Sequence, residues 1–243
     1  MDPQDHVARR PGGSQIIPNV PGARPAELPW WTALPAEHRA EFLTPERVLA
    51  AVAGRRALDA AAKPEAPREA AVLVPVLAPL STSSDPSARL LLTRRASDMG
   101  AHAGEIAFPG GAVDPGETLH AAALREAHEE VALDPATVEV VGELDRLATF
   151  VTRHVITPVV ARVDGLSDGV HALEPSPGEI ARIFDVSLVE LSGPDVVRSV
   201  HWNLGPHGQI VMTAFYLDDE TVWGATGRMV RQLLDLTFGP GPQ

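Results

Sequence analysis

Short apolar runs recur along most of the chain, and segments rich in glycine, proline and serine separate them. Two β-type runs, AAVLVPVLAP at 70–79 and ARLLLTRR at 88–95, flank the turn-rich segment STSSDPS, which favours an antiparallel pair of strands. Further along, TVEVVGELDRLATF and HVITPVVARV are strand-like, and DGLSDGVHALEPSPG at 164–178 has the composition of a long loop. SVHWNL and IVMTAFYL, joined by GPHGQ, predict a second hairpin.

Three segments instead have the apolar spacing of helices. Thr44 stands as an N-cap before PERVLAAVAGRRALDAA, which predicts a helix of about three or four turns. TLHAAALREAHEEVAL at 118–133 predicts a helix opened by Thr118, and TGRMVRQLLDLTF predicts an amphipathic C-terminal helix. One face of the 118–133 helix carries the apolar residues Leu124, Ala127 and Val131.

Residues 1–35 differ from the rest of the chain because proline and glycine are frequent and apolar residues are few. Such a composition does not bury enough apolar surface to fold alone, so we predict a flexible N-terminal arm. Trp30 and Trp31 near its end either pack locally or anchor the arm on the domain or on a partner. For residues 36–243, the pattern of elements predicts one α/β or α+β domain, in which helices precede, interrupt and follow a mixed sheet.

The charge balance and the composition exclude several classes of function. Acids outnumber Lys and Arg, which gives a formal net charge of −12 and argues against a protein that grips a nucleic-acid backbone. The chain has no cysteine, so zinc thiolate sites, disulfides and thiol nucleophiles are excluded. We see neither the apolar core of a secretory signal nor the roughly 18 apolar residues of a membrane span. We therefore expect a cytoplasmic protein without a membrane partner, and the sequence leaves open whether it forms a homodimer.

Three glutamates on the 118–133 helix are the first candidates for chemistry. Glu126, Glu129 and Glu130 lie at i, i+3 and i+4, so their carboxylates project from one face, opposite the apolar residues. Like charges so close repel one another unless a cation lies among them, and such hard oxygen ligands suit Mg²⁺ or Mn²⁺. An ordinary solvated acidic face is the alternative that the helix alone leaves open.

The residues around these glutamates form a longer pattern, G-x5-E-x7-R-E-A-x-E-E-x-A-L, which begins at Gly111. This pattern resembles the sequence box of the Nudix hydrolases, which cut pyrophosphate bonds in nucleotide-containing substrates. The resemblance implies a Nudix-type α/β/α sandwich, in which a loop–helix–loop packs against a mixed sheet. It also implies that the substrate is a small nucleotide-containing molecule.

The resemblance assigns a role to each charged residue of the box. Glu126, Glu129 and Glu130 would bind divalent metal ions, Mg²⁺ or Mn²⁺, that bridge the diphosphate of the substrate. Arg125 has an acidic partner one turn on and is expected to organise the carboxylates. Glu117 would tie the loop to the helix or contribute to metal binding through water.

One box position departs from the pattern, because Ala132 stands where the family usually has glycine. A left-handed conformation there is costly for alanine. We therefore expect either a differently shaped helix end or a strained backbone, and we keep the prediction of activity because no carboxylate is affected.

Upstream of the box, LLTRRASDMGAHAGEIAFPGG at 91–111 resembles a signature of the coenzyme A pyrophosphatase branch of the family. It implies that Arg95, Gly110 and Gly111 belong to the substrate site, where the two glycines allow a tight backbone turn. Arg95 either contacts a phosphate or pairs with acids on a neighbouring strand. Gly100 stands where the signature has an arginine, so the chain lacks a guanidinium group that could bind a phosphate with two hydrogen bonds at this position.

Other residues are candidates for activating or orienting the attacking water. Glu179 resembles the family's glutamate after the long loop and would orient water or complete the metal shell; the alternative is a helix N-terminal acid favoured by the dipole. Glu129 is the rival base. His102 also matches a common family residue and is expected to position its loop by hydrogen bonds rather than to transfer a proton.

Together the motifs predict metal-dependent hydrolysis of the pyrophosphate bond in coenzyme A or its acyl derivatives. The products would be 3′,5′-ADP and 4′-phosphopantetheine or its acylated form. Gly100 keeps another nucleoside diphosphate derivative as an alternative, whether a sugar conjugate, a dinucleotide or an oxidised nucleotide. A non-catalytic nucleotide-binding module is the third hypothesis, which the retained glutamates and Arg125 disfavour.

Overall fold

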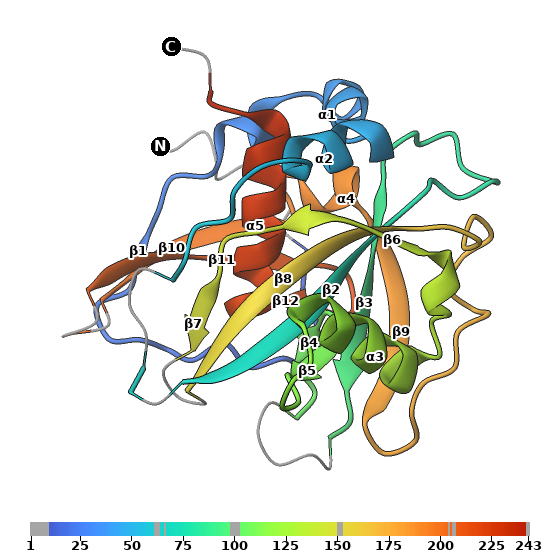
Figure 1. Cartoon of the computed structure of the whole chain (residues 1–243). Coiled ribbons are helices and arrows are strands. Elements are labelled where there is room, and N and C mark those ends of the chain that lie inside the picture. The colour runs from blue at the N-terminus through green and yellow to red at the C-terminus, as the bar shows by residue number, and fades with distance from the viewer. Residues whose placement is uncertain are drawn as a thin grey trace.

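Figure 1 shows the chain as a computed structural model, in which a central sheet is surrounded by helices. The structure describes residues 10–60, 64–65, 67–97, 103–149, 153–203, 205 and 208–241. The central sheet has eight strands. They are β2 (Arg68–Leu77), β3 (Arg89–Arg95), β4 (Ile106–Ala107), β5 (Gly110–Ala112), β6 (Val138–Glu143), β7 (Leu147–Thr149), β8 (His154–Val163) and β9 (Ile180–Ser187).

This sheet is mixed, because its two longest strands are parallel and their other neighbours are antiparallel. β2 pairs with β8 in parallel over its whole length, and both strands are almost continuously apolar because helices cover both faces of the sheet. The runs at 70–79 and 88–95 form the predicted antiparallel pair, with Val76 opposite Leu90. The predicted mixed α/β fold class is therefore confirmed.

A second sheet of four strands stands apart from the first, so the expectation of one sheet is wrong. Its strands, in spatial order, are β1 (Arg24–Pro25), β10 (Val197–Asn203), β11 (Gln209–Tyr216) and β12 (Thr221–Val222). β10 and β11 are the predicted second hairpin, with Val197 opposite Phe215. Local sequence predicted the hairpin but not its sheet, because tertiary packing decides which strands become neighbours.

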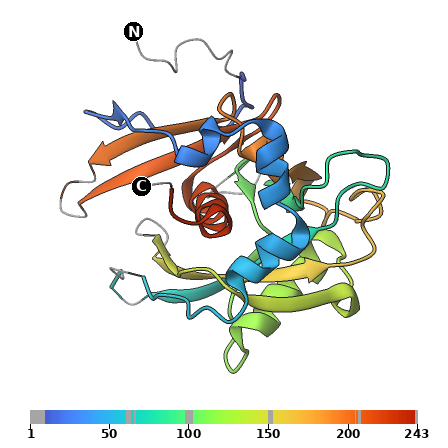
Figure 2. The same ribbon diagram turned by 90° about the horizontal axis from the view of Figure 1, so that it is seen from above.

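Helices cover both faces of the large sheet, as Figures 1 and 2 show. α3 (Leu119–Val131) packs on one face, where Ala127 belongs to the same apolar cluster as Leu73 and Val159. α2 (Pro45–Val52), α5 (Gly224–Phe238) and the second sheet share the apolar cluster of the other face. The other helical segments are η2 (Trp30–Ala33), α1 (Ala36–Phe42), η3 (Pro135–Thr137) and α4 (Leu188–Leu191). In the part of the chain that the structure describes, we find no helix with the length and apolarity of a membrane span.

The helix predicted after Thr44 is shorter than expected. α2 ends at Val52, and Gly54 follows with a φ of +70°. Arg55, which the helical spacing placed inside the helix, donates instead to the Asp145 carboxylate at 2.7 Å. Thr44 occupies the N-cap, but its side chain makes no capping hydrogen bond. A tertiary ion pair and a glycine thus override the local helical pattern.

Parts of the predicted arm contact the domain: the N–H of Gly12 donates to the Leu217 carbonyl at 2.8 Å, and β1 pairs with β10. Trp31 is fully buried, stacks on Phe238 with 5.4 Å between ring centroids, and donates from Nε1 to Asp235 at 2.9 Å. Trp30 packs edge-on against the same phenylalanine. Both tryptophans therefore make packing contacts within the chain. The division of the chain at residue 35 stays a prediction.

Candidate active site

α3 carries the predicted glutamates, and both of its ends have the residues that the sequence indicated. Thr118 is the N-cap, and its hydroxyl accepts a hydrogen bond from the N–H of Ala121 at 3.2 Å. The C-cap is Ala132, with φ of 55° and ψ of 29°, in the left-handed region. Of the two expectations for this position, the structure shows the strained backbone.

Replacing Ala132 with glycine is expected to raise the free energy of unfolding by about 1 kcal/mol. The left-handed conformation costs alanine roughly 1–2 kcal/mol, and the greater entropy of glycine in the unfolded chain offsets part of the gain. Urea denaturation measures the change. Ala136→Gly, at an exposed position without a positive φ, is the control and should lose stability; a loss at Ala132 as well would contradict the explanation.

Glu130 is the most deeply buried of the three helix glutamates. Its side chain is 6% exposed, against 19% for Glu126 and 56% for Glu129. Its carboxylate accepts hydrogen bonds from the N–H of Gly110 at 3.1 Å and from the Arg95 guanidinium at 3.4 Å. Burial raises the pKa of Glu130 to about 7, although these two donors act to lower it. Without a further cation, this carboxyl group is only partly ionised at neutral pH.

We expected the three carboxylates to project to solvent from a face opposite the apolar residues, but the carboxylate of Glu130 does not. Glu130 is buried together with Ala127 and Val131, because this side of α3 meets strand β5, which begins at Gly110. Leu124, expected in the apolar face, is only partly buried. The interpretation of the glutamates as an ordinary solvated face is therefore wrong for Glu130, because its carboxyl group is buried. A buried carboxyl group is costly without a partner, and Gly110 and Arg95 are its partners here.

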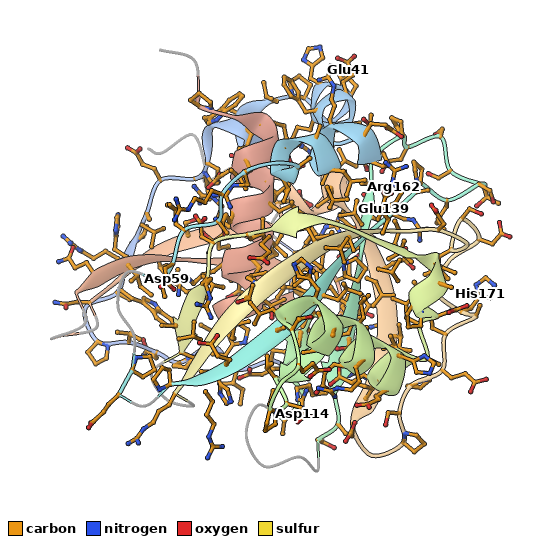
Figure 3. The ribbon with its side chains drawn as sticks, in the orientation of Figure 1. Glu41, Asp59, Asp114, Glu139, Arg162 and His171 are labelled. Carbon is orange, nitrogen blue, oxygen red and sulfur yellow. The ribbon has the colours of Figure 1, made fainter. Side chains whose placement is uncertain are left out.

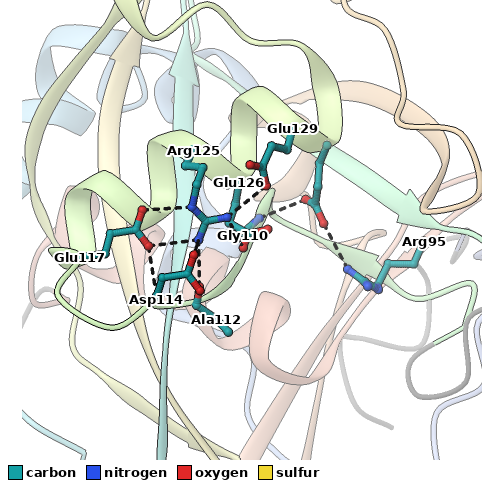
Figure 4. A network of polar contacts seen from close by, with 9 residues as sticks. Arg95, Gly110, Ala112, Asp114, Glu117, Arg125, Glu126 and Glu129 are labelled. Carbon is teal, nitrogen blue, oxygen red and sulfur yellow. Dashed lines mark hydrogen bonds and ion pairs between the residues drawn. The ribbon is translucent and has the colours of Figure 1, made fainter.

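Arg125 is the centre of a network of charged side chains along α3, which Figure 4 shows from close by. Its guanidinium donates to Glu117 at 3.0 and 3.1 Å, to Glu126 at 2.9 Å and to Glu129 at 3.0 Å. It also donates to the Ala112 carbonyl at 3.1 Å. The hydrogen bonds to Glu117 and Glu126 raise the pKa of Arg125 and keep it charged. These contacts support an organising role for Arg125 and a loop-to-helix role for Glu117.

Sequence reasoning missed Asp114, which lies in the loop before α3 (Figure 3). Its N–H donates to the Glu117 carboxylate at 3.1 Å, and its own carboxylate lies 4.0 Å from the Arg125 guanidinium. The run DPGE was the available signal, because aspartate, proline and glycine together indicate a tight turn before the box glutamate. The fold was needed to bring that turn beside Arg125.

Gly110 and Gly111 carry the backbone through the narrow space between β2 and α3. Gly110 has a φ of +157°, and a Cβ there would lie 2.5 Å from the Ala71 carbonyl oxygen. A Cβ on Gly111 would lie 2.5 Å from the carboxylate of Glu126. The two glycines lie in strand β5 and not in the predicted tight turn. Their close approach to β2 on one side and to Glu126 on the other has a steric basis.

Glu179 follows the long loop as expected, but a strand rather than a helix begins after it. Ile180 starts β9, and the Glu179 carbonyl accepts a hydrogen bond from the Ala96 N–H at 2.8 Å. The interpretation as a helix N-terminal acid is therefore wrong. The exposed Glu179 carboxylate accepts from the Ser176 hydroxyl at 3.3 Å, and its charge contributes to the raised pKa of Glu130.

Arg95 lies at the end of β3 and pairs with the carboxylate of Glu130. The sequence interpretation that it pairs with an acid is therefore correct, but Glu130 belongs to α3 and not to a neighbouring strand. Its contact with a substrate phosphate stays a prediction. Gly100 and His102 lie outside the described residues, so their roles stay predictions as well.

The chemistry of these side chains suits a divalent cation, but their present arrangement is not a preformed metal cage. Glu126, Glu129 and Glu130 offer hard oxygen ligands, and Glu126 contributes to the raised pKa of Glu130, which a cation would relieve. Among the described residues, no three acids or histidines converge closely enough to hold a metal ion. Glu126 and Glu129 are turned to Arg125, so metal binding requires them to exchange at least part of that contact.

Comparison with known proteins places this chain in a family. The NUDIX domain matches residues 67–203, more than half of the 243-residue chain. The uncharacterized Nudix hydrolase NudL of Photorhabdus laumondii is 37% identical over 169 residues, which cover 68% of this chain and 83% of that protein. NudL of Cronobacter sakazakii is 39% identical over 178 residues, covering 72% and 85%. A solved Nudix hydrolase from M. smegmatis, RenU, is 27% identical, covers 50% of this chain and 71% of that one, and has a TM-score of 0.38.

The chain therefore belongs to the Nudix family. Its enzyme class is that of a pyrophosphohydrolase, which acts on small nucleotide substrates. Divalent metal ions are the general cofactors of such enzymes. The names of the NudL relatives specify no substrate.

Proposed function

We propose that the protein hydrolyses the pyrophosphate bond of coenzyme A or its acyl derivatives, releasing 3′,5′-ADP and 4′-phosphopantetheine or its acylated form. The observation that carries this proposal is the meeting of two motifs at Glu130. This box glutamate accepts hydrogen bonds from Gly110 and Arg95, two residues of the segment that resembles the coenzyme A-type signature. One buried carboxylate thus joins the residues expected to bind metal to those expected to bind substrate.

Each residue of the site has a defined duty in this proposal. Glu126, Glu129 and Glu130 hold Mg²⁺ or Mn²⁺, which supplies positive charge to the diphosphate when bound. Arg95, with 24% of its side chain exposed, donates to a phosphate oxygen at the rim of the site. Gly110 fixes the buried Glu130 through its N–H, so this carboxylate keeps its position as substrate arrives.

The reaction needs an oriented water molecule and a group that accepts its proton. The water oxygen forms a bond to one phosphorus, and the bridging oxygen leaves with the other phosphate. Glu179 is our candidate for orienting this water and accepting the proton, and its electrostatic effect on Glu130 supports a place near the site. Glu129, whose side chain is 56% exposed, is the rival base.

A different nucleoside diphosphate derivative is the second candidate substrate. Gly100, in place of the signature arginine, is the observation that favours it. The neighbouring cation Arg94 pairs with the buried Glu220 at 2.9 Å, so its charge is already compensated. A sugar conjugate, a dinucleotide and an oxidised nucleotide belong to this class.

The test is turnover of coenzyme A, acetyl-coenzyme A, ADP-ribose and a dinucleotide, each with Mg²⁺ or Mn²⁺ and with products separated by chromatography. We expect 3′,5′-ADP from the first two and little product from the others. Cleavage of ADP-ribose or the dinucleotide instead would keep the pyrophosphohydrolase and replace the substrate. Nucleotide binding without any turnover would overturn the proposal in favour of a binding module.

The cytoplasmic location and the absence of nucleic-acid partners belong to the same proposal. The net charge of −12 supports the absence of nucleic-acid partners, since an acidic surface repels polyanions. A homodimer stays an open prediction, which sedimentation of the purified chain tests.

A further inference from the structure

Gln15, in the N-terminal segment, makes hydrogen bonds to two separate parts of the domain, which are Gly104 and the adjacent residues Glu220 and Thr221. Its Nε2 donates to the Gly104 carbonyl at 3.1 Å and to the Glu220 carboxylate at 2.7 Å. Its Oε1 accepts from the N–H of Thr221 at 2.8 Å. Gly104 lies between β3 and β4, and Thr221 begins β12. One amide side chain therefore ties the N-terminal segment to both sheets.

Glu220, one of these partners, is a buried carboxylate that holds two arginines together. It is fully buried and accepts from Arg94 at 2.9 Å and from Arg182 at 2.8 Å. The two arginines stand opposite each other on β3 and β9, where their like charges would repel without the acid between them. A buried charge is costly when any partner is removed, so Gln15 helps to fix the end of β3.

The backbone before Gln15 approaches the domain so closely that side chains are excluded. A Cβ on Gly13 would lie 2.4 Å from the Asp219 carbonyl oxygen, and one on Gly12 would lie 2.4 Å from the Thr221 hydroxyl. The N–H of Gly13 donates to that same hydroxyl at 3.0 Å. The run PGGSQ therefore suits close contact with the turn before β12 and sets the position of Gln15.

A short chain of contacts leads from Gln15 to the candidate active site. Gly104 is followed by Glu105, whose carbonyl accepts a hydrogen bond from the N–H of Arg95 at 3.0 Å. Arg95 in turn donates to Glu130 at 3.4 Å. Gln15 therefore supports the backbone of Arg95 by two routes. The first runs through Gly104 and Glu105, which bonds to the Arg95 N–H. The second runs through Glu220, which binds the adjacent residue Arg94.

We propose that Gln15 is a positioning residue for Arg95, and that the N-terminal segment thereby sets the affinity for the phosphate group of the substrate. Gln15 does not touch the substrate in this arrangement. It holds the backbone from which the Arg95 guanidinium reaches the site. The inference rests on the proposed function in one respect, which is that Arg95 contacts a substrate phosphate.

A double-mutant cycle tests the inference on whichever substrate the unmodified chain cleaves. Gln15→Ala is expected to raise KM about fivefold with kcat within about twofold, because the lost order affects binding rather than the chemical step. In the Arg95→Gln background the same change should raise KM less than about twofold, since residues that act through one contact are not additive. Independent, multiplicative effects on KM, or an effect on kcat alone, would overturn the inference.

The matched control is Ile16→Ala, because Ile16 directly follows Gln15 in the sequence and is 84% exposed. It should leave both KM and kcat unchanged. If Ile16→Ala raised KM as much as Gln15→Ala, the effect would come from the whole N-terminal segment and not from the Gln15 side chain, and the inference would be wrong. 

Hydrogen exchange gives a readout that does not depend on turnover. In Gln15→Ala, the amide of Arg95, which bonds to Glu105, should exchange at least about tenfold faster, while amides in α3 stay protected. Unchanged exchange at Arg95 would contradict the bracing. Faster exchange in a chain that cleaves no substrate would show that the brace exists and that the proposed function has failed.

Discussion

Replacing Glu129 and Glu130 together by glutamine is expected to lower kcat/KM by at least about 10³-fold while the fold is retained. Loss of a single preorganised electrostatic contact typically costs 10²–10³-fold, and this variant removes two negative charges from the proposed metal site. Glutamine keeps the size of each side chain and an acceptor for the N–H of Gly110. Because burial already disfavours the charged form of Glu130, a neutral amide should not destabilise the protein.

Two measurements keep this prediction specific. Glu139→Gln is the control, because Glu139 is 71% exposed on β6 and lies 3.6 Å from Arg162 (Figure 3), away from the network of Figure 4. It should leave turnover unchanged. Saturating Mn²⁺ should raise the unfolding free energy of the unmodified chain, by about 2.7 kcal/mol at 100 times its Kd, and not that of the double variant. Turnover within tenfold of normal in the double variant would refute the assignment.

The second large effect is expected at Gly110, where alanine should cost about 3 kcal/mol of stability. The added Cβ would lie 2.5 Å from both the carbonyl oxygen of Ala71 and the Cα of Val72. These are backbone atoms of β2, which β8 pairs with along its whole length, so they cannot move aside cheaply. Overpacking of this kind costs typically 1–3 kcal/mol, and the positive φ adds to it. Urea denaturation of the variant measures the loss.

Gly111→Ala is the matched comparison, because its added Cβ meets a side chain instead of backbone. The nearest atoms belong to the carboxylate of Glu126, which swings away by rotation about its side-chain bonds. We therefore expect a stability loss of about 1 kcal/mol or less, together with a marked fall in turnover because Glu126 leaves its position. Equal destabilisation at Gly110 and Gly111 would contradict the steric explanation.

Much of the candidate site was predictable because its residues are close in sequence. The box glutamates lie on one helix, so their spacing of three and four residues places them together without knowledge of the fold. Thr118 and Ala132 mark the ends of this helix for equally local reasons, a side-chain cap and a left-handed terminus. The spacing also placed Arg125 one turn from Glu129, and the two side chains are in contact.

The remaining features depend on contacts between distant segments, and local patterns failed there. Helical periodicity gives the angle of Glu130 around α3, but its burial is decided by Gly110 and Arg95, which are 20 and 35 residues away. The predicted helix after Thr44 stopped early because Arg55 pairs with a residue 90 positions along the chain. Glu179 precedes a strand because β9 pairs with β3.

By itself, the sequence determined the fold class, the order of most elements and the family to which the chemistry belongs, because these follow from local periodicity and from motifs of adjacent residues. Only the tertiary structure decided which glutamate is buried, how the strands divide between two sheets, and where Gln15 of the N-terminal segment meets the domain. The physical reason is that desolvation and hydrogen-bond partnership depend on what packs against a residue. Those neighbours are brought together by the whole fold, and no local pattern encodes them.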